Sequence, residues 1–197
     1  MSYPTLRLHP RKEESVLRFH PWIFSGAIAS FSAPVEDGDL VSVVDSKGRP
    51  LGTGHFGGGS IAVRLLSFDA EEVIDRAFYK RRLEAALRLR LSCDLVRPVG
   101  SSDSPNTTYR LVHGEGDSLP GLIIDIYDRT AVVQAHSLGM HQARQTIAEV
   151  LWEVFAEAGD PVLPLEGIYY KSETTLPTRD MRELASDGFL IGHTEAA

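Results

Sequence analysis

The stretch that decides the fold class runs from Leu40 to Phe68 and reads LVSVVDSKGRPLGTGHFGGGSIAVRLLSF. Three short runs in it, Leu40–Asp45, Leu51–Phe56 and Ile61–Phe68, have the alternating apolar pattern and the flanking turn residues of β-strands. Two earlier runs, Thr5–His9 and Ala27–Phe31, have the same character. Five short strands at this spacing predict a small β-barrel over residues 1–68.

Two helical segments interrupt or follow these strands. Arg11–Phe19 is short and polar, and it must end before Pro21. Asp69 is predicted to cap a longer helix that forms a connector over residues 69–92. Its apolar residues fall on two sides, which favours a helix held between two domains. One side carries Ile74, Phe78, Ala85 and Leu89, and the other carries Leu83, Leu87 and Leu91. Basic residues surround both sides, and surface ion pairs are their simplest interpretation; they are Arg76, Lys80, Arg81, Arg82, Arg88 and Arg90.

A polar linker over residues 93–107 separates this helix from a second predicted domain, 108–171. The expected strands are Tyr109–His113, Leu122–Tyr127, Thr130–His136 and Gly167–Lys171, and the expected helix is Leu138–Ala158. The middle two strands are close enough to form a hairpin through Asp128-Arg129. One helix on a small sheet gives an α+β domain, so the predicted fold class is mixed β and α+β. Residues 172–197 contain no convincing element and form a tail.

Composition describes an ordinary globular chain with an uneven charge distribution. The 197 residues are 43% hydrophobic and 24% charged, with a net charge of −7. Residues 1–92 have a balance of +2 and residues 93–197 a balance of −9, so the first half can present a basic face. Cys93 is the single cysteine, which excludes an internal disulfide. No run of about 20 apolar residues suggests a membrane helix. We therefore predict a cytoplasmic protein without a membrane partner.

Several combinations of residues suggest catalysis only weakly. Gly57–Ser60 joins two strands, whereas a phosphate loop leads into a helix. His113 lies close to Glu115 and Asp117, and it can be combined with Ser118 and Asp125, so a small hydrolase stays open as an alternative. The simpler interpretation is a tight loop whose acids accept hydrogen bonds from backbone amides. We predict no catalytic residue, no cofactor site and no metal site in this chain.

The strongest functional signal is a group of cations beside aromatic residues. Lys12, Arg18 and His20 precede or adjoin Trp22 and Phe24. Arginine and lysine bind phosphates, and an aromatic ring can stack on an exposed base. The alternative is that Trp22 and Phe24 are core residues. Both can hold together, with Trp22 buried and the cations exposed, and the cations beside aromatic residues favour RNA binding.

Two stretches resemble a known family, the bacterial large-subunit ribosomal RNA cytosine-5 methyltransferases. They read RFHPWIFSGAI over residues 18–28 and YRLVHGEGDSLPGLIIDIY over residues 109–127. The resemblance runs from about Leu6 to Lys171. It implies an N-terminal PUA-like barrel that helps bind RNA, a small central α+β domain, and a C-terminal Rossmann-like domain that binds S-adenosylmethionine and holds the catalytic cysteines. No pattern of that last domain is found in these 197 residues.

The resemblance therefore implies an RNA-binding and substrate-positioning part of the methyltransferase, not catalytic by itself, with ribosomal RNA as partner. The expected RNA contacts are Lys12, Arg18, His20, Trp22, Arg81, Arg82 and Arg110. The residues expected to face the catalytic domain are Gly114, Glu115, Asp117 and Pro120. S-adenosylmethionine is expected only for the full-length protein. A homodimer and a free-standing PUA-like RNA-binding or scaffold protein are the remaining alternatives.

Overall fold

The computed structural model describes residues 3–98, 100, 104–177 and 186–193. It divides into two compact units. The first contains Met1–Ile74 with Ser137–Gly139, and the second contains Asp75–His136 with Met140–Ala197. Parts of the predicted linker and tail (99, 101–103, 178–185 and 194–197) lie outside the described residues.

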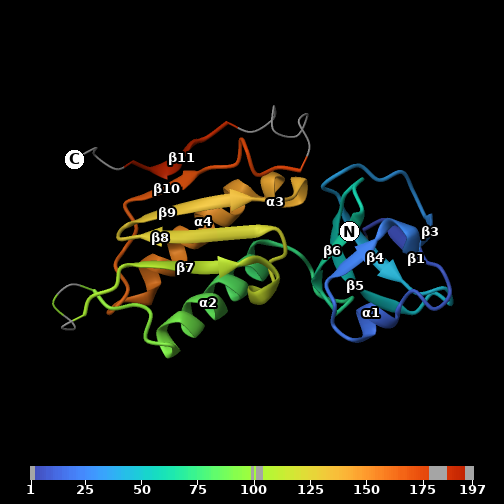
Figure 1. The fold of residues 1–197 in the computed structure, drawn as a ribbon, viewed down its shortest axis with the longest axis horizontal. Coiled ribbons are helices and arrows are strands. Elements are labelled where there is room, and N and C mark those ends of the chain that lie inside the picture. Colours follow the sequence, from blue (N-terminus) through green and yellow to red (C-terminus); the bar gives the residue numbers. More distant parts are fainter. Residues whose placement is uncertain (1–2, 99, 101–103, 178–185, 194–197) are drawn as a thin grey trace. The chain divides into compact units, whose positions relative to one another are not determined.

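The first unit is a curled six-stranded sheet with the strand order β2-β6-β5-β4-β1-β3 (Figure 1). Neighbouring strands are antiparallel except for β1 and β4, which are parallel. The strands are β1 (Thr5–Leu8), β2 (Trp22–Phe24), β3 (Ile28–Phe31), β4 (Leu40–Val44), β5 (Pro50–Phe56) and β6 (Ile61–Ser67). A short helix, α1 (Glu14–Leu17), and a 3-10 turn, η1 (Ser25–Ala27), join the first strands. The sheet has open edges at β2 and β3, so the predicted barrel is a half-barrel.

The core of the first unit comes from alternate strand positions, as the sequence pattern predicted. Leu6 and Leu8 of β1 and Val41 and Val43 of β4 are completely buried in it, together with Val63 of β6. The strand β2 was not predicted, and the count of five strands was therefore wrong. It has three residues, and its place depends on antiparallel pairing with β6, more than thirty positions later. The loop Gly57–Ser60 joins β5 to β6, which confirms that it is a hairpin loop.

The second unit is a mixed five-stranded sheet in the order β11-β10-β9-β8-β7. Its strands are β7 (Thr108–His113), β8 (Leu122–Tyr127), β9 (Thr130–Ala135), β10 (Gly167–Tyr170) and β11 (Gly188–Gly192). The predicted hairpin between β8 and β9 is present, with Tyr127 opposite Thr130. The pair β9 and β10 is parallel, and parallel neighbours need a crossover. Two helices provide it, α3 (Leu138–Gln142) and α4 (Arg144–Ala158).

Two expectations for the second unit differ from the structure. The single helix predicted over 138–158 is divided at Ala143 into α3 and α4. The tail was predicted to lack any element, but β11 pairs antiparallel with β10. A strand of five residues with glycine at both ends carries little periodicity, and its pairing with β10 defines it. Across the described residues, no helix is both long and apolar enough to span a membrane.

The helix after the first unit, α2 (Arg76–Ser92), starts later than predicted. Asp75 is its N-cap, and the Asp75 carboxylate accepts a hydrogen bond of 2.9 Å from the Phe78 amide. Asp69 instead accepts from the Glu71 amide in a separate turn. The expectation of two apolar sides is wrong, because Ala85 and Leu89 of the first side are exposed, Leu89 by 49%. The helix has one buried face, packs on α4 and β7, and belongs to the second unit.

Candidate nucleic-acid interface

The segment that contains α1 and its turn to β2 presents three of the predicted RNA contacts to solvent. Lys12 lies just before α1, and Arg18 and His20 follow it; all three are exposed. The Arg18 side chain is 81% exposed and lies 3.8 Å from the Glu14 carboxylate. An exposed pair of this kind contributes little free energy, so the Arg18 guanidinium can exchange this partner for a phosphate.

The contacts of the His20 ring define its orientation and the tautomer of its neutral form. The Trp22 amide donates a 3.2 Å hydrogen bond to His20 Nδ1, and the two rings meet edge to face at 5.7 Å. Because Nδ1 accepts this bond, the neutral imidazole carries its proton on Nε2. His20 is exposed, so this N–H is a hydrogen-bond donor for a ligand oxygen.

The aromatic residues of β2 are less buried than a core assignment requires. Trp22 is half-buried, and Phe24 is 53% exposed. The core interpretation is therefore wrong for Phe24, while Ile23 between them points into the core at 2% exposure. Strand alternation explains the difference, since neighbouring residues face opposite sides of the sheet. Base stacking by Trp22 stays a prediction.

The other predicted RNA contacts lie in the second unit and have protein partners. The Arg82 guanidinium lies 5.0 Å from the centre of the Phe78 ring. Arg110 donates two hydrogen bonds to Asp125, at 2.8 and 3.0 Å, and these raise the pKa of Arg110. Arg81 lies on the exposed side of α2. The seven predicted contacts therefore divide between the two units, with four in the first.

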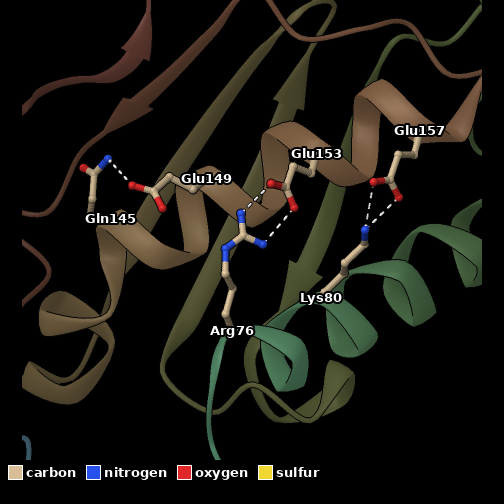
Figure 2. A network of polar contacts seen from close by, with 6 residues as sticks. All are labelled: Arg76, Lys80, Gln145, Glu149, Glu153 and Glu157. Atoms are coloured by element: carbon tan, nitrogen blue, oxygen red, sulfur yellow. Dashed lines mark hydrogen bonds and ion pairs between the residues drawn. The ribbon is translucent and has the colours of Figure 1, made fainter.

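Ion pairs between α2 and α4 account for two further basic residues, as the sequence suggested (Figure 2). Arg76 holds Glu153 through two hydrogen bonds, at 2.8 and 2.6 Å, and Lys80 holds Glu157 at 2.8 Å. The hydrogen bond from Arg76 lowers the pKa of Glu153, and the hydrogen bond that Lys80 donates to Glu157 raises the pKa of Lys80. These cations are matched by carboxylates of the same unit, so we do not count them as RNA contacts.

The loop that carries the second resemblance is held from inside the unit. It contains a 3-10 turn, η2 (Gly114–Asp117), and the Asp117 side chain is only 4% exposed. Both carboxylate oxygens of Asp117 accept from Arg90, at 2.5 and 2.7 Å. Asp117 also accepts from the His113 amide at 2.6 Å, and Arg90 donates to the Arg110 carbonyl. The prediction that the loop acids bind backbone amides is confirmed for Asp117.

Sequence reasoning missed Arg90 as a partner of this loop. The signal was present, because Arg90 follows Leu83 and Leu87 at helical spacing on the buried face of α2. Of the four residues expected to face a catalytic domain, Gly114, Asp117 and Pro120 are enclosed within the second unit. Glu115 is the exposed member and stays a predicted contact.

The same contacts argue against a hydrolase. Asp117 is bound by Arg90, and Asp125 is bound by Arg110. His113 Nδ1 lies 3.2 Å from the Arg110 guanidinium, so neither Asp117 nor Asp125 is placed to orient the imidazole as a base. Within the described part of the chain, no three His, Cys, Asp or Glu side chains are grouped to hold a metal ion.

A groove runs beside this loop, between the end of α2 and β7. Leu89, Cys93 and Leu95 line one side, and Tyr109 and His113 line the other. Leu89 and Leu95 are 49% and 41% exposed, so both present apolar surface to solvent. Burial raises the pKa of Tyr109 to about 12. The groove is one apolar surface of the second unit, and the homodimer stays a prediction.

Comparison with known proteins identifies the first unit. The PUA-like domain family matches residues 6–68, the same residues that form the curled sheet. The first unit is therefore a PUA-like domain by sequence as well as by architecture.

Similarity extends beyond this domain to ribosomal RNA large subunit methyltransferases. The chain is 33% identical over 196 residues to ribosomal RNA large subunit methyltransferase I of Klebsiella pneumoniae subsp. pneumoniae, covering 99% of this chain and 45% of that protein. It is 40% identical over 153 residues to the protein of the same name from Shewanella amazonensis, covering 77% of this chain and 37% of that protein. The chain is thus homologous to these methyltransferases and spans less than half their length.

Solved structures show the same fold. A putative SAM-dependent methyltransferase from Streptococcus mutans matches with a TM-score of 0.72 and 18% identity, covering 100% of this chain and 44% of that one. A putative methyltransferase complexed with SAH matches with a TM-score of 0.71 and 18% identity, covering 99% of this chain and 44% of that one. At this identity the likeness concerns the fold.

Proposed function

We propose that this chain is the RNA-binding and substrate-positioning part of a ribosomal RNA large subunit methyltransferase. The observation that carries the proposal is the segment around α1, where Lys12 before the helix and Arg18 and His20 after it are exposed on a PUA-like domain. Cations exposed in this way suit phosphate oxygens, and the His20 Nε2–H adds a directed donor. Because the chain is similar to ribosomal RNA methyltransferases, ribosomal RNA is the RNA that we propose it binds.

Methyl transfer is proposed for the whole protein. The relatives are more than twice as long as this chain, and one structural neighbour holds SAH. We propose that S-adenosylmethionine supplies the methyl group in the whole protein and that cytosine C5 accepts it. The 197 residues would then bind and orient the RNA without catalysing the transfer, in the cytoplasm as the sequence predicts.

Binding should be weak and dependent on salt, because phosphate contacts release counterions. We expect the double variant Lys12→Ala, Arg18→Ala to bind a ribosomal RNA fragment about tenfold more weakly. The slope of log K against log salt should fall by about 1.8, which is two lost phosphate contacts. Fluorescence anisotropy with a labelled RNA fragment at several salt concentrations measures both quantities.

The matched control is Lys47→Ala, Arg88→Ala, which removes the same charge from other surfaces. Lys47 lies exposed in the turn after β4, and the Arg88 side chain is 70% exposed on α2. This control should keep affinity and slope nearly unchanged. If both double variants behave alike, general charge and not the α1–β2 turn determines binding, and the contact assignment is wrong.

One observation favours a second candidate, a free-standing PUA-like RNA-binding or scaffold protein. The segment after β10 is integrated into the fold, since Ser172 and Glu173 amides donate to Asp187 and β11 completes the sheet. A self-contained module would have such a finished sheet. A variant shortened to end at Lys171 tests this. If it unfolds at the same temperature as the full chain, the segment after β10 does not stabilise the fold, and the second candidate loses its support.

A further inference from the structure

Phe19 occupies a position in the α1–β2 turn where glycine is the expected residue. The Phe19 amide donates to the Val16 carbonyl at 2.9 Å, and the His20 amide donates to the Ser15 carbonyl at 3.0 Å. This pair of bonds is the Schellman motif that ends a helix, and it requires a left-handed residue at its centre. Phe19 has a φ of +61°, which satisfies the motif.

A bulky aromatic residue in this conformation is strained, because its Cβ crowds the following carbonyl. Glycine would relieve the strain at no steric cost. Burial does not explain the choice of phenylalanine, since Phe19 is 73% exposed. Its ring meets the Phe68 ring edge to face, with the ring centres 5.3 Å apart and the planes at 72°. Strained residues of this kind cluster at active sites and ligand-binding sites.

The neighbours of Phe19 indicate what the ring contacts. Arg18 before it is an exposed cation, and His20 after it offers an N–H directed by the Trp22 amide. Three consecutive residues thus present a cation, an aromatic ring and a hydrogen-bond donor on one rigid turn. An aromatic platform beside cations is the chemistry that binds unpaired nucleotides, in which a base stacks and its phosphate meets the charge.

We propose that Phe19 is the stacking platform for one unpaired base of the bound RNA. The inference deepens the RNA-binding function proposed above and rests on it. It narrows the substrate to RNA with a bulged or looped-out nucleotide at this turn. A protein partner fits less well, because the nearby Lys12 is of a residue type that is depleted at protein–protein interfaces.

The variant Phe19→Gly separates stacking from folding. Glycine at a left-handed position should leave the unfolding temperature unchanged or raise it. With a labelled RNA hairpin that carries one bulged nucleotide, Phe19→Gly should bind about tenfold more weakly than the natural chain. With the fully paired version of the same hairpin, the two should bind alike. Phe19→Trp should retain the preference for the bulge.

Phe31→Ala is the matched control. Phe31 is 40% exposed on the same unit and has the same kind of contact, edge to face with Phe56 at 5.3 Å. It should bind both hairpins as the natural chain does.

The outcomes distinguish the two proposals. If Phe19→Gly binds both hairpins as well as the natural chain does, stacking is refuted and RNA binding stands. If it weakens both hairpins equally, Phe19 supports the shape of the turn and does not contact a base. If the natural chain binds neither hairpin at low salt, the proposed function fails and this inference fails with it. If Phe19→Gly binds both hairpins normally but no longer self-associates, the ring contacts a second protein molecule and not a base.

Discussion

The two stretches that carry the family resemblance use their polar residues in opposite ways. The α1–β2 turn of the first unit exposes Arg18 and His20 and holds Phe19 in a strained conformation to do so. The loop after β7 turns its Asp117 inward, onto Arg90. The first stretch presents polar groups to solvent, and the second uses its buried carboxylate within its own unit. A recognisable motif therefore does not by itself mark a contact surface.

The largest effect on stability should come from breaking the ion pair between Arg90 and Asp117. We expect Arg90→Met to lower the free energy of unfolding of the second unit by about 3–5 kcal/mol, because it leaves the buried Asp117 carboxylate without its cation. Urea denaturation followed by circular dichroism measures this value. Arg88→Met, two positions away and exposed, should change it by less than about 0.5 kcal/mol.

The double variant Arg90→Met, Asp117→Leu tests whether the loss in Arg90→Met comes from the unpaired Asp117 carboxylate. An apolar pair of similar volume should recover a large part of the loss, since no charge is then left buried. If Arg90→Met alone is as stable as the natural chain, the ion pair does not hold the loop. The contrast between the two motif stretches would then lose its basis.

A smaller effect is expected at the start of α2. Asp75→Ala removes the acceptor for the Phe78 amide and should cost about 1 kcal/mol. Asp69→Ala removes a turn acceptor outside the helix and should cost less than Asp75→Ala. Thermal unfolding of both variants tests the order, and equal losses would mean that the helix start extends to residue 69, as the sequence alone suggested.

The sequence predicted the parts of the fold that local pattern determines. Alternation identified β4, β5 and β6, and the spacing of Tyr127 and Thr130 identified a hairpin. The sequence alone could not select Asp75 over Asp69 as the N-cap of α2, because aspartate is a good cap residue at either position. The strands β2 and β11 are three and five residues long, and their pairing with distant strands defines them.

The candidate site was predicted to a similar extent. Cations near residues 12–20 were visible as residue types, and their exposure follows from a polar segment. The left-handed Phe19 was not predictable, since the motif that requires it normally contains glycine. The Arg90–Asp117 pair joins residues 27 positions apart, and that distance closes only when α2 packs beside β7. Contacts of this range depend on tertiary structure.

The smallest effect should be found in the ion pairs between α2 and α4 (Figure 2). The side chains of Arg76 and Glu153 are 44% and 42% exposed, so water and salt screen their attraction. Because the hydrogen bond from Arg76 lowers the pKa of Glu153, the pair stabilises the unit above the ordinary pKa of glutamate and loses this effect as the pH falls below it. A double-mutant cycle of Arg76→Ala and Glu153→Ala should show a small favourable coupling at neutral pH. This coupling free energy should become smaller in molar salt, and also at a pH below the ordinary pKa of glutamate. A coupling as large as that of Arg90 with Asp117, and insensitive to salt, would show that solvent exposure does not separate the surface contacts of this chain from the buried one.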